Sequence, residues 1–344
     1  MSTAAPIRLV ALLTALLAHV PAFGARFQDV LAPAGPQAGH LHDLWLVMLC
    51  VCTAVFAAVL AAFFYALWRS PPGDLKAAAE RELPGPSRRS AARSVAFAVT
   101  VSVLMLIFLI VASYATDRAL ARLPLENALR IEVTANQWWW DLRYQDAVAS
   151  RIFTTANELH IPVGRPIVLT LKSSDVIHSL WIPNLHGKRD LIPGHTTTLQ
   201  LKADQPGTYR GQCAEFCGFQ HAFMALLVIA EPPEQYEAWA ERQRQPASAP
   251  TAAKAVQGER LFLTTTCAMC HAIQGTSAAA RRAPDLTHVA GRQTLAAGRL
   301  ANTAADLEHW ISDPQQYKPG VNMPSHQFEP EDRQALVEYL RGLQ

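Results

Sequence analysis

Two long apolar runs stand out in the first third of the chain. They occupy residues 44–68 and 95–114, and neither run contains a charged side chain. A helix needs roughly 20 apolar residues to cross the hydrocarbon core of a bilayer, which is close to the length of each run. The pattern therefore predicts a hairpin of two transmembrane helices within residues 25–120.

The segment between these two runs is basic. Its positive side chains are Arg69, Lys76, Arg81, Arg88, Arg89 and Arg93. Loops on the cytoplasmic side of membrane proteins are enriched in lysine and arginine. We therefore expect this loop to be cytoplasmic and all residues after Tyr114 to be exported.

A shorter apolar run precedes the hairpin. Arg8 is followed by apolar residues 9–18, and small residues follow near Gly24. A basic start, a short apolar middle and a small-residue exit are typical of a secretory signal peptide. We expect residues 1–24 to form such a peptide. An uncleaved anchor is the alternative, but this run is short for a membrane span.

From about Leu129 the pattern changes to short alternating runs bounded by glycine, proline and asparagine. The runs are 130–134, 158–161, 166–171, 197–201 and 225–229. Short alternating runs at this spacing predict an antiparallel β-sandwich, which we assign to residues 121–233.

The chain then passes through a stretch rich in proline, alanine, serine and threonine. This composition is typical of a flexible linker, which we assign to residues 234–254. A separate domain is expected from residue 255 to residue 344. Acidic and basic residues balance from Lys254 onward, so this domain lacks a strongly basic face. A tether would instead supply a high effective concentration of the domain beside its neighbour.

Composition narrows the classes of function. Half of the 344 residues are hydrophobic and only 17% are charged, as expected for a membrane protein. The net charge of +2 argues against nucleic acid as a partner. The six cysteines form three close pairs: Cys50 with Cys52, Cys213 with Cys217, and Cys267 with Cys270. The first pair lies in a predicted span, where apolar packing is expected.

Soft metal ligands are concentrated in one short loop. Cys213 and Cys217 stand four residues apart, and His221 and Met224 follow. Thiolate, imidazole and thioether groups form a ligand set for copper, and two thiolates can bridge two ions. His178, one hairpin upstream, can supply a second imidazole. A disulfide would leave the histidine and methionine unexplained, and a zinc site would not need the methionine.

The predicted C-terminal domain contains a haem-attachment motif. Cys267, Cys270 and His271 form the pattern Cys-x-x-Cys-His, in which two thioethers hold the porphyrin and the histidine binds the iron. Met323 is the expected sixth ligand. Met269, between the cysteines, is too constrained for that role.

His288 is a weaker rival for the sixth position. The segment resembles class I cytochrome c, and residues 284–286 and 310–314 share the resemblance. Ligation by histidine and methionine raises the potential of a haem.

Together these motifs resemble a known family. The run Cys-x-Glu-x-Cys-x-x-x-His-x-x-Met, preceded by Asp-Val-x-His-Ser, is similar to subunit II of the haem–copper cytochrome c oxidases. The fused cytochrome c domain is similar to the caa-type members. The resemblance covers nearly the whole chain and implies a cupredoxin-like β-sandwich with a dinuclear CuA centre. The implied ligands are His178, Cys213, Cys217, His221, Met224 and the backbone carbonyl of Glu215.

The resemblance also implies a role in electron transfer. Electrons would pass from an external donor, either cytochrome c or a quinol–cytochrome c reductase, through haem c and CuA to haem a. That haem belongs to catalytic subunit I, which reduces O2 to water and pumps protons. The other oxidase subunits are further implied partners. The protein would be a two-pass protein of the bacterial inner membrane, with both cofactor domains on the periplasmic side.

Three consecutive tryptophans, residues 138–140, interrupt the first strand region. On a strand, Trp138 and Trp140 would share one face and Trp139 would point away. Packing in the core is one interpretation of these indoles. The other comes from the family resemblance, in which Trp138 matches the tryptophan where electrons enter the copper centre.

Two further features follow from the resemblance. The carboxylate of Glu215 would reach a Mg2+ or Mn2+ ion shared with the catalytic subunit, for which oxygen is the right ligand. Residues 188–194 would pack on that subunit. In contrast, residues 88–94 lack the acid that often feeds a proton channel in this family. A contribution to that channel is therefore in doubt.

Two alternative functions stay open. A CuA-containing subunit of a membrane nitric oxide reductase would share the same motifs. A copper-delivery protein would also use paired cysteines and a distant histidine, but such proteins place them in a thioredoxin-like alternation of strands and helices. The sequence does not show that alternation.

Overall fold

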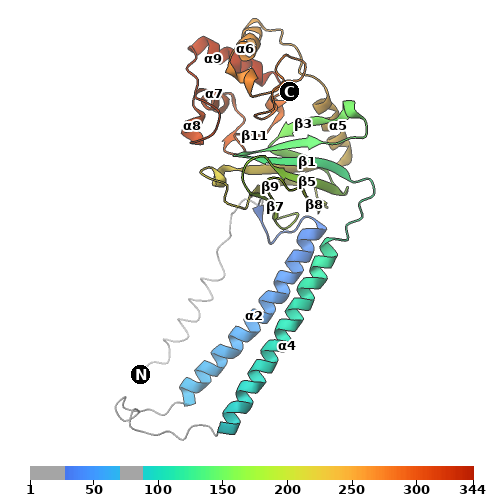
Figure 1. The fold of residues 1–344 in the computed structure, drawn as a ribbon, viewed down its shortest axis with the longest axis vertical. Helices are drawn as coiled ribbons and strands as arrows, with labels where there is room; N and C mark the ends of the chain where they lie inside the picture. Colours follow the sequence, from blue (N-terminus) through green and yellow to red (C-terminus); the bar gives the residue numbers. More distant parts are fainter. Residues whose placement is uncertain (1–27, 70–87) are drawn as a thin grey trace, which may run out of the picture.

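The computed structural model describes residues 28–69 and 88–344 (Figure 1). The predicted signal peptide and most of the predicted cytoplasmic loop lie outside the described residues. The described chain forms a helical hairpin, a β-sandwich next to one end of the hairpin, and a helical domain on the far side of the sandwich.

The hairpin consists of α2 (Pro36–Arg69) and α4 (Arg88–Leu120), which run side by side. Both are long and apolar enough to cross a membrane, and their apolar side chains face outward, as Phe64 and Ile110 do. Such an uncovered surface is suited to lipid. Helix α4 begins with two arginines and has no acidic residue in its first turn.

The sandwich contains two sheets of five strands each. One sheet has the order β3-β2-β1-β5-β8 and the other β4-β10-β9-β6-β7. The strands are β1 (Leu129–Asn136), β2 (Trp139–Tyr144), β3 (Phe153–Ala156), β4 (Glu158–Pro162), β5 (Ile167–Ser173), β6 (His178–Trp181), β7 (Arg189–Leu191), β8 (Thr197–Leu201), β9 (Gly207–Cys213) and β10 (Ala225–Glu231). The five predicted strands correspond to β1, β4, β5, β8 and β10.

The predicted antiparallel pairing holds for most neighbouring strands of the sandwich, but two pairs are parallel. β1 pairs with β5 in parallel, and β10 pairs with β4 in parallel. The cause is that the chain crosses from one sheet to the other between β3 and β4 and returns at β5. Strands that are not neighbours in the sequence therefore become neighbours in each sheet.

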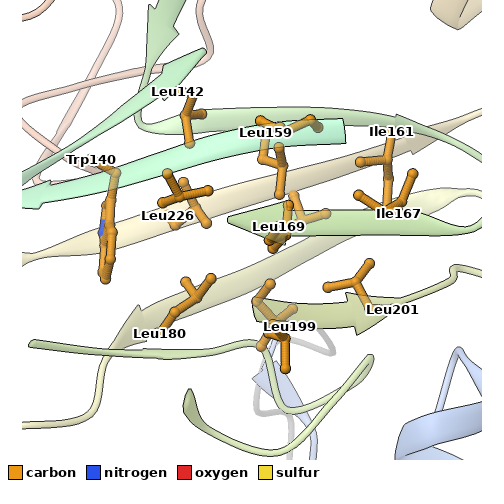
Figure 2. Close-up of a cluster of buried hydrophobic side chains, with 14 of the residues drawn as sticks. Trp140, Leu142, Leu159, Ile161, Ile167, Leu169, Leu180, Leu199, Leu201 and Leu226 are labelled. Atoms are coloured by element: carbon orange, nitrogen blue, oxygen red, sulfur yellow. The ribbon is translucent and has the colours of Figure 1, made fainter. Parts of the chain in front are cut away.

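The core of the sandwich lies between the two sheets. Alternate residues of β5, including Ile167 and Leu169, point into it and are fully buried (Figure 2). They meet Leu159, Leu180 and Leu226 of the opposite sheet. This period of two is the pattern from which the strands were predicted.

The segment predicted as a linker begins with a helix. Helix α5 (Pro233–Arg244) packs on the sandwich through Tyr236, Trp239 and Ala240. The Trp239 ring stacks on His160, with ring centroids 4.0 Å apart. Only residues 245–252 then connect α5 to the first helix of the C-terminal domain.

The C-terminal domain is mainly helical. Its elements are α6 (Ala253–Thr264), η4 (Thr266–Met269), η5 (Val289–Gly291), β11 (Thr294–Leu295), β12 (Leu300–Ala301), α7 (Ala304–Ser312), α8 (Pro314–Tyr317) and α9 (Pro330–Arg341). Helix α6 crosses α9 closely at Gly258. A Cβ atom there would lie 2.0 Å from the main-chain oxygen of Ala335, so glycine is required for this packing.

Candidate functional site

The predicted copper loop connects two adjacent strands. Cys213 ends β9, and β10 begins immediately after Met224. The backbone N–H of Cys213 donates to the oxygen of Met224 at 3.0 Å and closes the loop at its base. β9 and β10 pair antiparallel, so the loop is held on a rigid hairpin.

The six predicted copper ligands converge. The sulfurs of Cys213 and Cys217 lie 3.7 Å apart, and the Met224 sulfur lies 3.9 Å from that of Cys217. The main-chain oxygen of Glu215 lies 3.2 Å from the Cys213 sulfur. No disulfide joins the two cysteines, which are free and buried.

Each of the two histidines faces a different sulfur. Nδ1 of His178 lies 3.7 Å from the Cys213 sulfur, and Nδ1 of His221 lies 3.6 Å from the Cys217 sulfur. His178 reaches the loop because it begins β6, whose Leu180 is paired with Cys213 of β9. The donor set is therefore two thiols, two imidazoles, a thioether and a carbonyl. These groups fit copper, and the shared sulfurs fit a pair of ions.

The orientation of His178 is fixed by Asp175. Nε2 of His178 lies 2.8 Å from a carboxylate oxygen of Asp175, which leaves Nδ1 directed at the sulfur. Burial opposes a charge on the imidazole, but Asp175 and Cys213 raise the pKa of His178 above its ordinary value. A carboxylate behind a ligating histidine is a common device for setting ring orientation at metal sites.

The paired thiols favour loss of one proton. The hydrogen bond from Cys217, together with His178, lowers the pKa of Cys213 below its ordinary value. The interaction with Cys213, reinforced by burial, raises the pKa of Cys217. One thiolate is therefore readily available without metal, and a cation is needed to stabilise the second.

Trp138 contacts the copper loop directly. Its indole N–H donates to the main-chain oxygen of Cys217 at 2.9 Å, and the side-chain amide of Gln137 donates to the same oxygen at 2.7 Å. The neighbouring Gly218 has φ +111°, and a Cβ there would lie 3.0 Å from Trp138. Glycine therefore allows the indole to lie against the loop.

The predicted Mg2+ or Mn2+ site is not supported. The main-chain oxygen of Glu215 approaches the Cys213 sulfur. Within residues 28–69 and 88–344, the one group of acidic, histidine or cysteine side chains close enough to hold an ion is His178, Cys213 and Cys217.

The haem-attachment motif opens onto a cavity in the C-terminal domain. Cys267 and His271 line this cavity, together with apolar residues such as Phe262 and Leu340. Nδ1 of His271 lies 2.7 Å from the oxygen of Pro284, so this nitrogen donates to it and Nε2 stays free for a metal. Burial lowers the pKa of His271, which keeps the imidazole neutral, as ligation requires. These residues fit a covalently attached haem.

Met323 lines the same cavity as His271. Its segment is held by Gln315, whose amide donates to the oxygens of Val321 and Met323 at 2.9 Å each. His326 also lines the cavity, and sequence reasoning did not consider it. In the sequence, its position three residues after Met323 is the feature that could have indicated that it lies near the haem.

The rival ligand His288 lies elsewhere. Its two ring nitrogens contact the main-chain oxygens of Gln344 and Gln245, at 2.6 Å and 3.0 Å. Its side chain is therefore already occupied in joining the C-terminus to the connecting segment.

The sandwich completes the haem cavity. Gln137, Trp138, Trp139 and Asn157 line it from the sandwich side. The predicted alternation of the three indoles was wrong, because β1 ends at Asn136 and Trp138 lies in the turn before β2. Trp138 and Trp139 therefore both line the cavity, whereas Trp140 is buried in the core.

Known proteins share both halves of this arrangement. Residues 129–231 match the family described as the periplasmic domain of cytochrome C oxidase subunit II, and residues 255–344 match cytochrome c. The chain is similar to cytochrome c oxidase subunit 2 of Alkalihalophilus pseudofirmus, with 36% identity over 91% of this chain and 90% of that protein. It is also similar to the Bacillus subtilis protein of the same name, with 29% identity over 98% of this chain and 97% of that protein.

A solved structure resembles part of the chain. It is the periplasmic domain of subunit II of cytochrome oxidase from Bradyrhizobium japonicum, which is 29% identical. The match covers 35% of this chain and 97% of that domain, with a TM-score of 0.33.

Proposed function

Because the chain belongs to the cytochrome c oxidase subunit II family, we propose that it is the subunit through which electrons enter a haem–copper oxidase. Electrons from an external donor would leave it for catalytic subunit I, where O2 is reduced to water. The predicted membership of the family and the fused cytochrome c domain are confirmed. The identity of the donor and the route within the chain are parts of the proposal.

One observation carries the proposal. Trp138 lines the haem cavity and also donates a hydrogen bond to Cys217 of the copper loop. A single side chain therefore touches both cofactor sites. When bound, haem c and a copper pair supply one-electron redox chemistry. The protein's contribution is to hold the two sites on either side of this indole.

Distinct residues would hold each group. Cys267 and Cys270 would anchor the haem, with His271 and Met323 as its axial ligands. The copper ions would be held by the following set: His178, Cys213, Glu215 through its carbonyl, Cys217, His221 and Met224. Cys213 and Cys217 are each only 3% exposed, and Met224 is fully buried. Such burial favours permanent retention of metal and speaks against copper delivery to another protein.

The arrangement in space supports a membrane-anchored subunit. Both cofactor domains lie at the same end of the two apolar helices, and Arg88, Arg89 and Arg93 lie near the opposite end (Figure 1). By the positive-inside rule, the end of the helices that carries these arginines faces the cytoplasm. We therefore place the sandwich and the cytochrome domain on the periplasmic side of a bacterial inner membrane.

The test is to purify the chain with its partner subunits and to measure copper content, electron paramagnetic resonance and gas consumption. We expect two copper ions per chain in addition to the copper held by the catalytic subunit, a signal delocalised over both ions, and consumption of O2 on addition of an electron donor. A spectrum of mononuclear copper would contradict the proposed site. Consumption of NO instead of O2 would identify the alternative, a subunit of a nitric oxide reductase.

A further inference from the structure

A buried lysine joins the cytochrome domain to the sandwich. Lys318 is only 2% exposed, although lysine is rarely this buried in proteins. Its ammonium donates to the main-chain oxygen of Trp138 at 2.9 Å and to that of Ala296 at 3.2 Å. Trp138 belongs to the sandwich and Ala296 to the cytochrome domain. The ammonium therefore bridges the two domains at the residue that touches both cofactor sites.

Lys318 begins the segment that carries the predicted haem ligand Met323. The next residue, Pro319, accepts a hydrogen bond from the side-chain amide of Gln220 in the copper loop, at 2.7 Å. Gly320 follows, and a Cβ there would lie 3.8 Å from the Trp138 ring. The haem-ligand segment is thus attached both to the copper loop and to the indole beside it.

A second buried charge lies on the other side of the interface. Glu158 of the sandwich is 2% exposed. Its carboxylate accepts hydrogen bonds from the backbone N–H groups of Gln293 and Thr294, each at 2.8 Å, and from the Thr294 hydroxyl at 3.2 Å. Lys318 of the cytochrome domain therefore takes one of its two partners from the sandwich, and Glu158 of the sandwich takes its partners from the cytochrome domain.

These contacts specify one relative position of the domains. A buried polar group is costly unless it is hydrogen-bonded. Shifting either domain would remove the Trp138 oxygen from Lys318 and the two backbone N–H groups from Glu158. The backbone N–H of Ala225, next to the copper ligand Met224, also donates to the oxygen of Ala297 at 3.1 Å. A flexible tether alone would produce many relative positions.

We infer that Lys318 is a positioning residue which, with Glu158 as a second anchor, holds the haem cavity against Trp138. The cytochrome domain then works from a fixed docked position and not as a tethered shuttle. This inference rests on the proposed function, because positioning matters only if electrons pass between the two sites.

The test compares Lys318→Met with Lys254→Met in the full chain assembled with its partner subunits. Lys254 is an exposed lysine of the same domain, and its ammonium contacts Gln334. The first readout is amide hydrogen exchange of the peptide containing Gln293 and Thr294. The backbone N–H groups of these two residues are hydrogen-bonded to Glu158, the other anchor. The second readout is the rate at which one electron passes from flash-reduced haem to the oxidised copper centre. No bond is made or broken in this step.

Loss of the ammonium leaves two buried carbonyls without a partner. We expect Lys318→Met to speed exchange at Gln293 and Thr294 by roughly tenfold or more and to slow the electron transfer by a similar factor. Lys254→Met should change neither by more than about twofold. Unchanged exchange and rate in Lys318→Met would overturn the inference. Faster exchange with an unchanged rate would also overturn it, because docking would then not govern transfer.

Failure of the proposed function gives a different result. In that case the unsubstituted chain itself would pass no electron from haem to copper, whatever the exchange data show. If Lys318→Met loses its haem, Glu158→Gln provides the same test, with the exposed Glu237→Gln as its control. We expect Glu158→Gln to show faster amide exchange at Ala225 and slower electron transfer from haem to copper. Glu237→Gln should show neither change.

Discussion

The two cofactor sites differ in how they are built. The copper site lies entirely within the sandwich, on the loop between β9 and β10 and at the start of β6. The haem cavity lies in the cytochrome domain but takes part of its wall from Gln137, Trp138 and Trp139 of the sandwich. The first site therefore depends on local strand pairing, and the second depends on how two domains meet.

This difference predicts how mutations should separate the two sites. Changes in the copper loop should affect copper and leave the haem in place. Changes at the interface should leave both cofactors bound and affect the rate of electron transfer between them.

The largest effect is expected for Cys217→Ser. The serine hydroxyl replaces the sulfur that faces Cys213, His221 and Met224, so the bridged copper pair cannot form. We expect loss of the delocalised copper signal and of O2 consumption. Absorbance of the haem should be retained, because Cys267, Cys270 and His271 lie in another domain. Loss of the haem as well would show that the two sites are not independent.

A smaller effect is expected for Asp175→Asn. The amide cannot orient and polarise His178 as the carboxylate does, and such changes typically weaken metal binding by about 10- to 100-fold. Competition with a copper chelator measures this affinity. Asp204→Asn is the matched control and should leave the affinity unchanged, because Asp204 is an exposed residue that pairs with Lys202. Equal affinities for both variants would contradict the role given to Asp175.

Trp138→Phe should slow electron transfer between the two sites without loss of either cofactor. The phenyl ring keeps much of the contact with the cavity but loses the hydrogen bond to Cys217. We expect electron transfer between the sites to slow by about tenfold, with both cofactors retained. Trp139→Phe is the comparison, because Trp139 lines the cavity without a hydrogen bond to the copper loop. If Trp139→Phe slowed electron transfer more than Trp138→Phe does, Trp139 would be the contact between the two sites and Trp138 would not.

The smallest effect concerns the stability of the interface region. Burial, with a further contribution from Asp285 of the cytochrome domain, raises the pKa of Asp141 to about 6. The folded protein then holds this proton more tightly than the unfolded chain. Stability therefore decreases as pH rises from about 4 to about 6, and the full penalty persists above that range.

Asp141→Asn removes this penalty. We expect the variant to be more stable than the unsubstituted protein by about 1–3 kcal/mol at pH 8, with a gap that shrinks as pH falls toward 4. Urea unfolding at several pH values measures the difference. A gap that does not vary with pH would show that Asp141 is ionised equally in both states.

The sequence was most informative where the chemistry is local. The predicted copper ligands other than His178 lie within twelve consecutive residues, and the strand pattern around them predicted a sandwich. Strands β2, β6 and β9 were missed because tryptophans, a histidine and glycines interrupt their alternation. Strands β3 and β7 were missed because they are only 4 and 3 residues long, too short to show a period. The parallel pairings were missed because they depend on where the chain crosses between the sheets.

Contacts between distant segments could not be predicted. Lys318 and Trp138 are 180 residues apart, and no periodicity relates them. The composition of residues 245–253 suggested only a flexible connection. In the structure, α5 packs on the sandwich instead. The backbone N–H of Ala247 donates a hydrogen bond to the main-chain oxygen of Gln274 in the cytochrome domain, at 2.9 Å. Docking is thus a property of the folded surfaces, which composition does not reveal.

Following one electron in the complete oxidase after flash reduction of the haem tests the docked arrangement most directly. We expect the copper signal to change at the rate at which the haem is reoxidised. This rate should be the same at low and high salt, because the contacts that dock the domains are buried and poorly screened. Haem reoxidation without any change at copper, or a rate that falls steeply with salt, would contradict the docked arrangement.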